Sequence, residues 1–293
     1  MNKTITKDKV VIFHGSCDDG VGGAFLFWQL FKDTADYYPG YYQDPAPDLT
    51  GKEVYIVDFS FPEEATMQIA NIAKSLVWMD HHKSTEALAE KLKALALPTV
   101  KVMFDNARSG ARLAFDYITE TYGQTDPAYD RIKGLEEFTN YIQDNDLWQF
   151  KLTGSKEFSL ALRSRRQKFE IWDTLDVEGL VQEGAAMKLF YDAKVAEVCR
   201  LAYDKEIFGH TVPIVNCNGM FASDVGNVLA KGRPFSISWW YDGKHKTFVF
   251  SLRSDENGAD VSELAAKVGG GGHARAAGFK LAPDKVDSIL DLE

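Results

Sequence analysis

Short apolar runs alternate with segments of helical spacing over residues 1–122. The β-branched run 9–13 predicts a strand, and apolar residues three or four positions apart over 22–32 predict a helix. The later units pair strands with helices, at 53–57 and 65–74, 76–79 and 85–95, and 100–104 and 109–122. Before the second helix, Ser60 offers an N-cap and Pro62 an early proline. Strands that alternate with helices of this length predict a parallel sheet covered on both faces, a doubly wound α/β domain.

The pattern changes after residue 130. Helical spacing continues to about residue 204 and predicts a helical connector. Beyond it, β-rich runs predict strands over 212–217, 235–241 and 247–252, separated by helices over 223–231 and 261–268. We therefore expect a smaller C-terminal α+β domain. The expected boundaries are 1–185 for the first domain, 186–204 for a helical linker and 205–293 for the second domain.

Composition supports a folded protein of two domains. The chain has 293 residues, of which 45% are hydrophobic and 26% charged, as in soluble globular proteins. The longest apolar stretch, 24–31, is interrupted by Gln29 and is much shorter than the ~20 residues that cross a bilayer. The first nine residues carry no apolar segment typical of a secretory signal. We expect a cytoplasmic protein that does not span a membrane.

Cysteine usage and charge narrow the function. Cys17, Cys199 and Cys217 lie far apart, which fits a reducing compartment. A formal charge of −10 disfavours binding of long duplex nucleic acid, because such binding relies on many Lys and Arg contacts. A short anionic substrate held by metal ions fits this charge.

Acidic and histidine side chains follow three of the expected strands. These residues are His14, Asp19, Asp58, Asp80, His81 and His82. An Asp after a strand is often only a turn former or helix cap. Several together, at the strand ends where doubly wound sheets bind ligands and in a chain with six histidines, predict metal binding. Asp144 and Asp146 add carboxylates, and so many ligands favour two metal ions.

In this order and spacing, these residues resemble the four motifs of the DHH phosphoesterases. Near the C-terminus, four glycines at 269–272 precede His273, and Gly278 follows. This segment resembles the glycine-rich signature of the DHHA1 domain, which accompanies DHH domains in RecJ-like and NrnA/NrnB-like nucleases. The resemblance covers nearly the whole chain. It implies a DHH domain with a doubly wound sheet, followed by an α+β DHHA1 domain.

The resemblance also implies a phosphodiesterase that uses two divalent metal ions, usually Mn²⁺, in an active site between the two domains. Mg²⁺, Fe²⁺ and Zn²⁺ suit the same ligands. Asp58 would bridge the ions, Asp80 would orient a ligand imidazole, and His82 would face the scissile phosphate. The implied ligands are His14, Asp19, Asp58, His81 and either Asp144 or Asp146.

One residue departs from the family pattern. Cys17 stands where the commoner first motif has an Asp, two positions before Asp19. The cysteine either fills space as a small hydrophobe, or it or the adjacent Asp18 coordinates a metal ion. A thiolate ligand would favour Zn²⁺ or Fe²⁺ over Mn²⁺.

Several residues are candidates for substrate binding. The N–H groups of Gly270, Gly271 and Gly272 suit an anion, and His273 resembles the family's substrate-facing histidine. Arg253, at the end of a strand, suits bidentate binding of a terminal phosphate. Ser109 either contacts substrate or caps the helix that follows it.

Together these features predict hydrolysis of short single-stranded oligonucleotides or dinucleotides to mononucleotides. The chain has no room for the extra domains of RecJ-type exonucleases, and the glycine signature is absent from family II pyrophosphatases. Hydrolysis of cyclic or bisphosphorylated nucleotides is an alternative, as is a non-catalytic nucleotide-binding relative. The sequence leaves the oligomeric state open between a monomer and a homodimer.

Overall fold

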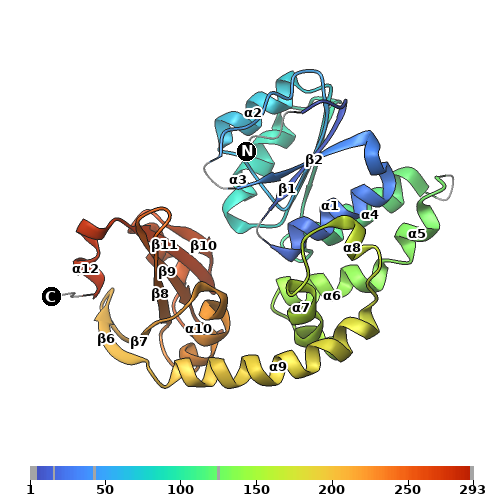
Figure 1. Ribbon diagram of the computed structural model, residues 1–293. Coiled ribbons are helices and arrows are strands. Elements are labelled where there is room, and N and C mark those ends of the chain that lie inside the picture. Colours follow the sequence, from blue (N-terminus) through green and yellow to red (C-terminus); the bar gives the residue numbers. More distant parts are fainter. Residues whose placement is uncertain (1–4, 16, 42–43, 124–125, 291–293) are drawn as a thin grey trace. The chain divides into compact units, whose positions relative to one another are not determined.

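The computed structural model describes residues 5–15, 17–41, 44–123 and 126–290. Two compact units make up the chain, Met1–Lys188 and Leu189–Glu293. Helix α9 (Val177–Cys199) carries the chain from the first unit to the second. Each unit has its own sheet and its own hydrophobic core (Figure 1). Over the described residues, none of the helices has both the length and the hydropathy that a bilayer crossing needs.

The first unit is built on a five-stranded parallel sheet in the order β2-β1-β3-β4-β5. Its strands are β1 (Lys9–His14), β2 (Ala35–Gly40), β3 (Glu53–Val57), β4 (Ser75–Asp80) and β5 (Val100–Phe104). The chain moves outward from β1 to β2 and then returns to β3 on the other side. This reversal makes the carboxyl ends of β1 and β3 the topological switch point, where open α/β sheets bind ligands.

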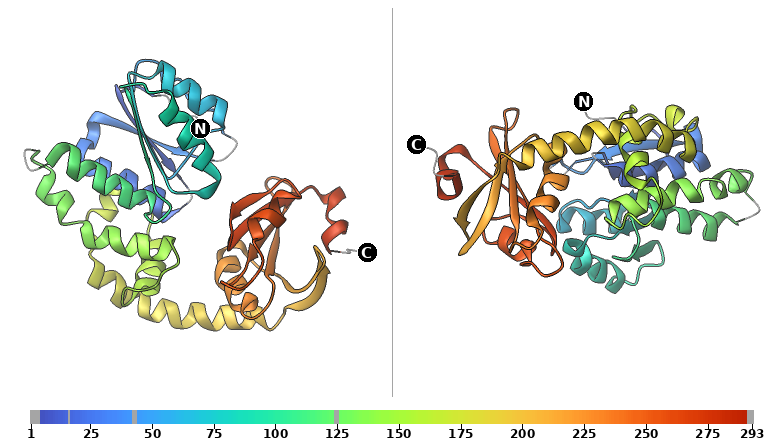
Figure 2. Two further views of the ribbon diagram at one scale, coloured as in Figure 1. Left: turned by 180° about the vertical axis from the view of Figure 1, so that it is seen from behind. Right: turned by 90° about the horizontal axis from the view of Figure 1, so that it is seen from below.

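Successive residues of each strand project to opposite faces of the sheet. Val11, Tyr55 and Val77 face a core shared with α1 and α4, whereas Val10 and Val54 face one shared with α2 and α3. These helices are α1 (Asp18–Phe31), α2 (Glu63–Ile72), α3 (Glu86–Ala94) and α4 (Gly110–Tyr122). Helices therefore cover both faces (Figure 2). The predicted doubly wound α/β fold is confirmed.

Besides the start of α9, four further helices of the described residues belong to the first unit and pack on the side of α1 and α4. They are α5 (Tyr129–Lys133), α6 (Glu136–Asp146), α7 (Ser155–Arg163) and α8 (Phe169–Trp172). Phe138, Phe158 and Trp172 from these helices enter the same core as Phe25 of α1. Because α6 packs against α1 and α4, its last residue, Asp146, reaches the carboxyl edge of the sheet.

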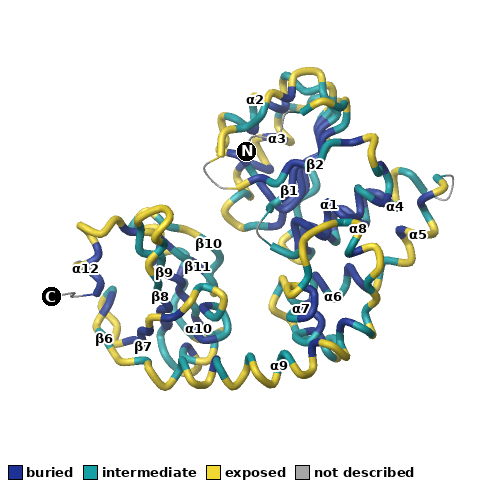
Figure 3. Tube along the Cα trace, in the orientation of Figure 1, coloured by how far each residue is buried: buried dark blue, intermediate teal, exposed yellow. Residues whose placement is uncertain are grey.

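The second unit contains a six-stranded sheet in the order β10-β11-β9-β8-β7-β6, antiparallel except for the parallel pair β7–β8. Its strands are β6 (Tyr203–Ile207), β7 (His210–Asn216), β8 (Ser236–Asp242), β9 (Thr247–Arg253), β10 (Gly271–His273) and β11 (Ala276–Leu281). Its helices are α10 (Ala222–Ala230), α11 (Val261–Ala266) and α12 (Asp287–Leu290). The tube in Figure 3 shows the buried segments of β7, β8 and β9 at the centre of this unit.

The structure differs from the sequence prediction at a few local points. Strands β2, β6, β10 and β11 were not predicted. Ser60 is not an N-cap, because Pro62 occupies the cap position of α2 and no side chain caps that helix. The Ser60 hydroxyl instead donates a hydrogen bond to Asp80, 3.0 Å away. The prediction of a cap was wrong because a buried carboxylate competes for the hydroxyl.

Candidate metal centre

Side chains that the sequence singles out meet at the carboxyl edge of the parallel sheet. His14 ends β1, Asp58 follows β3, and His81 follows Asp80 at the end of β4. Among the described residues, the potential metal donors form three groups, and the donor atoms within each group lie within 4.8 Å of one another. The groups are His14 with Cys17 and Asp58, Asp58 with His81 and His82, and Asp19 with His81 and Asp146.

Asp58 belongs to two of these groups through different oxygens. Its Oδ2 lies 2.9 Å from Cys17 Sγ and 3.6 Å from His14 Nδ1. Its Oδ1 lies 3.2 Å from His81 Nε2 and 3.7 Å from His82 Nδ1. Each oxygen of this buried carboxylate therefore faces a different set of donors. This is the arrangement that a carboxylate bridging two cations requires.

The backbone of Asp58 is held in an uncommon conformation. Its φ is 54°, in the left-handed region that L-residues other than Asn and Asp rarely adopt. The Asp58 N–H donates to the carbonyl of Met79 on the neighbouring strand at 2.9 Å. A Cβ at Gly110, at the start of α4, would lie 2.5 Å from the Asp58 Cβ, so glycine is needed there. Strain at a buried carboxylate of this kind is typical of functional sites.

The centre holds more negative charge than its own histidines offset. Asp19 is buried and accepts N–H bonds from Gly110 at 2.6 Å and Ala111 at 2.9 Å. Burial, together with the charges of Asp146 and Asp58, raises the pKa of Asp19 well above its ordinary value. Desolvation likewise outweighs the attraction of His81 and raises the pKa of Asp146 to about 6. Bound cations would relieve this repulsion between carboxylates.

The imidazole of His81 lies close to the same carboxylates. His81 Nε2 lies 3.8 Å from Asp19 Oδ2 and 3.5 Å from Asp146 Oδ2. Burial lowers the pKa of His81, but the hydrogen bond to Asp58 and the charges of Asp146 and Asp19 raise it to about 10. Hydrogen bonds from His14 and His81 outweigh burial at Asp58 and hold the pKa of that carboxyl well below its usual range.

Asp80 fixes the turn that carries His81 and His82. Its Oδ1 accepts from His82 Nδ1 at 2.6 Å and from the backbone N–H groups of His81 at 2.7 Å and His82 at 3.2 Å. Its Oδ2 accepts from Ser60 at 3.0 Å and Thr85 at 3.1 Å. The carboxylate therefore fixes the ring of His82 and the turn after β4.

In two places the structure directs candidate ligands that are close in sequence toward different partners. The Asp144 carboxylate accepts backbone N–H bonds from Lys151 at 2.9 Å and Leu152 at 3.2 Å, so it faces the loop after α6. Asp146 faces His81 instead. Asp18 accepts from Arg163 Nε at 2.7 Å, whereas Cys17 turns toward His14 and Asp58.

Ser109 is fully buried and caps α4. Its Oγ accepts from the N–H of Arg112 at 3.3 Å, and its own N–H donates to Gln143. Sequence reasoning missed three further residues that support the centre, namely Ser60, Thr85 and Asn106. Asn106 donates to the carbonyl of His81 at 2.7 Å. Short polar side chains after strands are too common for sequence alone to single these out.

The substrate-binding candidates of the second unit lie on neighbouring strands in matching register. His273 on β10 pairs with Ala276 on β11, which pairs with Arg253 on β9. Directly paired residues of antiparallel strands project from the same face. His273 and Arg253 therefore share a face, with only the small side chain of Ala276 between them.

Arg253 is held in place by neutral groups. Its guanidinium donates to Ser223 Oγ at 2.7 Å, Ser251 Oγ at 3.0 Å and the carbonyl of Leu252 at 2.8 Å. Gly226 leaves room for its stem, since a Cβ there would lie 2.7 Å from Arg253 Cγ. Burial lowers the pKa of Arg253 to about 10, so the side chain remains charged at neutral pH.

Most of the glycine segment has a structural explanation. A Cβ at Gly270 would lie 2.3 Å from the carbonyl oxygen of Gly278, and one at Gly272 would lie 2.5 Å from that of Ala276. Gly269 has a φ of +78°, which favours glycine. Gly271 differs: it is exposed, and a Cβ there would meet nothing within 4 Å. The fold does not explain the absence of a side chain at Gly271.

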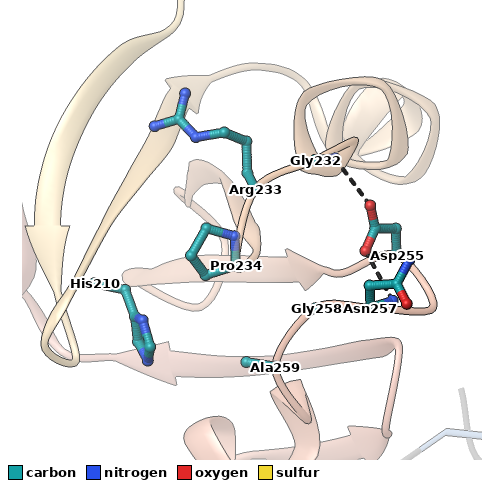
Figure 4. Close-up of a pocket in the computed structure, with 8 residues that line it drawn as sticks. All are labelled: His210, Gly232, Arg233, Pro234, Asp255, Asn257, Gly258 and Ala259. Atoms are coloured by element: carbon teal, nitrogen blue, oxygen red, sulfur yellow. Dashed lines mark hydrogen bonds between the residues drawn. The ribbon is translucent and has the colours of Figure 1, made fainter.

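A separate pocket of the second unit is shown in Figure 4. Asp255 accepts from the N–H of Gly232 at 2.9 Å, and Arg233 pairs with Asp204 at 2.7 Å. These polar groups therefore have partners within the protein. The eight lining residues are His210, Gly232, Arg233, Pro234, Asp255, Asn257, Gly258 and Ala259, none of which is a predicted site residue.

Comparisons with known proteins agree with this architecture. Residues 225–292 match the DHHA1 domain. The chain is 29% identical over 306 residues to uncharacterized protein R106 of Acanthamoeba polyphaga mimivirus, covering 95% of this chain and 69% of R106. It is 25% identical over 251 residues to oligoribonuclease NrnB of Bacillus subtilis, covering 78% of this chain but only 58% of NrnB. The structure of PggH, a pGpG-specific phosphodiesterase from Vibrio cholerae, shares the fold, with a TM-score of 0.56, 16% identity and 97% of each chain covered.

A doubly wound domain with a histidine and aspartate centre at its switch point, followed by a DHHA1 domain, is the architecture of a phosphoesterase. Phosphoesterases are hydrolases that cleave phosphate esters. Residues 225–292 are a DHHA1 domain by this match, and the chain as a whole is similar to phosphoesterases of the DHH/DHHA1 family, in agreement with the resemblance found in the sequence motifs.

Proposed function

We propose that this protein is a two-metal phosphodiesterase that hydrolyses short oligonucleotides or dinucleotides to mononucleotides. The observation that carries the proposal is the orientation of Asp58, whose two oxygens face two different sets of donors. The names of two relatives support the substrate class, since NrnB is an oligoribonuclease and PggH is specific for pGpG.

The residues present fit two divalent ions. One would be held by His14 and Asp58 Oδ2, and the other by Asp58 Oδ1, His81, Asp19 and Asp146. Imidazole and carboxylate donors suit Mn²⁺ and also Fe²⁺ or Zn²⁺. A pair of divalent ions held by these residues would supply Lewis acidity for water activation and for the charge that develops on the phosphate.

The protein's own groups would set the geometry of the reaction. Asp19 is fixed by two N–H groups at the start of α4, and Asp58 by its strained backbone. Asp80 holds the ring of His82, which we assign to the scissile phosphate. Rigid donors of this kind lose little entropy when substrate binds.

The second unit would bind a phosphate of the substrate. All hydrogen bonds of the Arg253 guanidinium within the described part of the chain go to neutral oxygens, so its charge remains available to an anion. His273 shares its face, and the backbone at Gly271 is open to close approach.

A substrate panel tests the proposal. Purified protein is freed of metal with a chelator and supplied with Mn²⁺, Mg²⁺, Zn²⁺ or no metal. It is then assayed on RNA dinucleotides, pGpG, single strands of increasing length, cyclic dinucleotides and polyphosphate. We expect metal-dependent release of mononucleotides, fastest with about two to five nucleotides. Equal rates without metal, or rates that keep rising up to long strands, would overturn the proposal. Preferential cleavage of cyclic dinucleotides would replace the proposed substrate class.

A further inference from the structure

Cys17 occupies the N-cap of α1, but capping does not explain a cysteine. Its backbone is extended, and its Sγ accepts from the N–H of Gly20 at 3.3 Å. Ser, Thr, Asp and Asn are the preferred caps. A thiol is a weak acceptor and caps less well than any of them. The choice of cysteine therefore needs another reason.

The surroundings of Cys17 are polar. Its Sγ lies 2.9 Å from Asp58 Oδ2 and 3.1 Å from His14 Nδ1, and these two atoms are 3.6 Å apart. Ligand atoms bound 2.0–2.3 Å from one ion lie roughly 3.0–3.6 Å from one another. The three donor atoms are thus spaced like one face of a coordination sphere.

The structure also disfavours the alternatives for this position. Cys17 contributes to none of the hydrophobic clusters found among the described residues, so it does not act as a small core hydrophobe. Asp18 is paired with Arg163 at 2.7 Å. Of the two neighbours, only Cys17 joins His14 and Asp58.

We infer that Cys17 binds one of the two metal ions as a thiolate and makes that half of the centre selective for a borderline ion such as Zn²⁺ or Fe²⁺. The inference rests on the proposed function, because it requires metal ions at Asp58. Binding releases the thiol proton to solvent. The other half, with Asp19, Asp146 and His81, keeps nitrogen and oxygen donors that suit Mn²⁺. The two halves then differ in metal preference.

Cobalt provides a direct readout of the thiolate. The metal-free full-length protein is titrated with Co²⁺, and the near-ultraviolet charge-transfer absorption of a cobalt–thiolate bond is recorded. We expect this band in the wild type and its loss in Cys17→Ser, which retains an N-cap side chain and should fold. Cys199→Ser and Cys217→Ser are the matched controls and should keep the band.

Metal competition gives a second measurement that does not depend on activity. Wild type and Cys17→Asp are equilibrated with equal Zn²⁺ and Mn²⁺, and bound metal is counted by elemental analysis. We expect the Zn²⁺-to-Mn²⁺ ratio to fall at least about tenfold in Cys17→Asp, because oxygen replaces sulfur. An unchanged ratio would overturn the inference.

The outcomes distinguish this inference from the proposed function. Co²⁺ binding that needs Asp58, but shows no thiolate band, would refute the role of Cys17 and leave the metal centre standing. Absence of any stoichiometric Co²⁺ binding by the wild type would refute both. A band that persists in Cys17→Ser would assign the thiolate to another cysteine.

Discussion

Two regions of the molecule hold charged groups of opposite sign. One is the candidate metal centre at the ends of β1, β3 and β4, and the other is the face formed by β9, β10 and β11. In the first, desolvation and the charges of neighbouring carboxylates raise the pKa of Asp19 and Asp146. In the second, the partly buried guanidinium of Arg253 donates its hydrogen bonds to neutral oxygens, and Asp224 acts on it only through its charge. Crowded anions favour bound cations, and a guanidinium whose hydrogen bonds within the described residues all go to neutral oxygens favours a bound anion. This difference supports the proposals of metal binding in the first unit and phosphate binding in the second.

Removing the shared carboxylate should have the largest effect. Asp58→Asn keeps a side chain that tolerates the left-handed backbone, so the fold should survive. Because even outer partners of metal ligands are worth 10–100-fold, we expect kcat/KM to fall more than about 100-fold. Elemental analysis and steady-state kinetics measure the loss. Asp8→Asn, at an exposed carboxylate, is the control and should match wild type. Wild-type activity in Asp58→Asn would show that hydrolysis does not depend on a metal centre at Asp58.

Removing the positive charge of Arg253 should lower kcat/KM and leave the metal content unchanged. Arg253→Gln loses a charge-assisted bidentate contact, which is worth about 1.5–3 kcal/mol, so kcat/KM should fall roughly ten- to a hundredfold. The comparison uses one dinucleotide with a terminal phosphate and one without. Wild type should discriminate between the two and Arg253→Gln should not. Arg233→Gln, whose guanidinium pairs with Asp204, is the control. Equal discrimination in Arg253→Gln would show that this arginine only supports the fold.

Two glycines of one segment should respond differently to the same change. Gly270→Ala places a Cβ against the carbonyl of Gly278 and should destabilise the protein by about 1–3 kcal/mol, seen as a lower Tm. Gly271→Ala meets nothing in the protein, so Tm should hold while KM for dinucleotides rises severalfold. If Gly271→Ala leaves KM unchanged, substrate does not approach the backbone there.

The smallest effect is expected at Ser109. Loss of the N-cap in Ser109→Ala should lower the free energy of unfolding by about 1 kcal/mol, measured by denaturant titration. The side chain is fully buried and reaches the centre only through a hydrogen bond to Asp19, which keeps its two backbone N–H partners in the variant, so kcat/KM should fall only severalfold. A large kinetic defect with unchanged stability would favour the substrate-contacting alternative that the sequence left open.

The strands that the sequence predicted are those with the strongest physical signal. Buried β-branched runs revealed β1 and β3, whereas β2 carries Asp36 and Pro39 at a sheet edge and gives no such signal. Strand β10 consists of two glycines and His273, and only its partner β11 makes it a strand. Pairing with a neighbouring strand, and not the segment's own residues, makes these segments strands.

The general position of the candidate site could be predicted from the order of the strands. Parallel strands end on one edge, so His14, Asp58 and His81 had to come close. Residues two apart on a helix point in nearly opposite directions, so the sequence predicts that Asp144 and Asp146 do not face the same site. It does not tell which of the two faces the metal centre. The partners of Asp80 and the turn of Cys17 toward His14 depend on tertiary contacts that no local pattern encodes.

The central claim is that Asp58 joins two separate metal sites, and the number of ions bound per chain tests it most directly. Equilibrium dialysis against Mn²⁺ or Zn²⁺, followed by elemental analysis, should give about two ions per wild-type chain and none in Asp58→Asn. His14→Ala and Asp146→Asn should each retain one ion, because each removes a donor from a different side of Asp58. One ion in the wild type, or loss of the same ion in both single-site variants, would contradict the account.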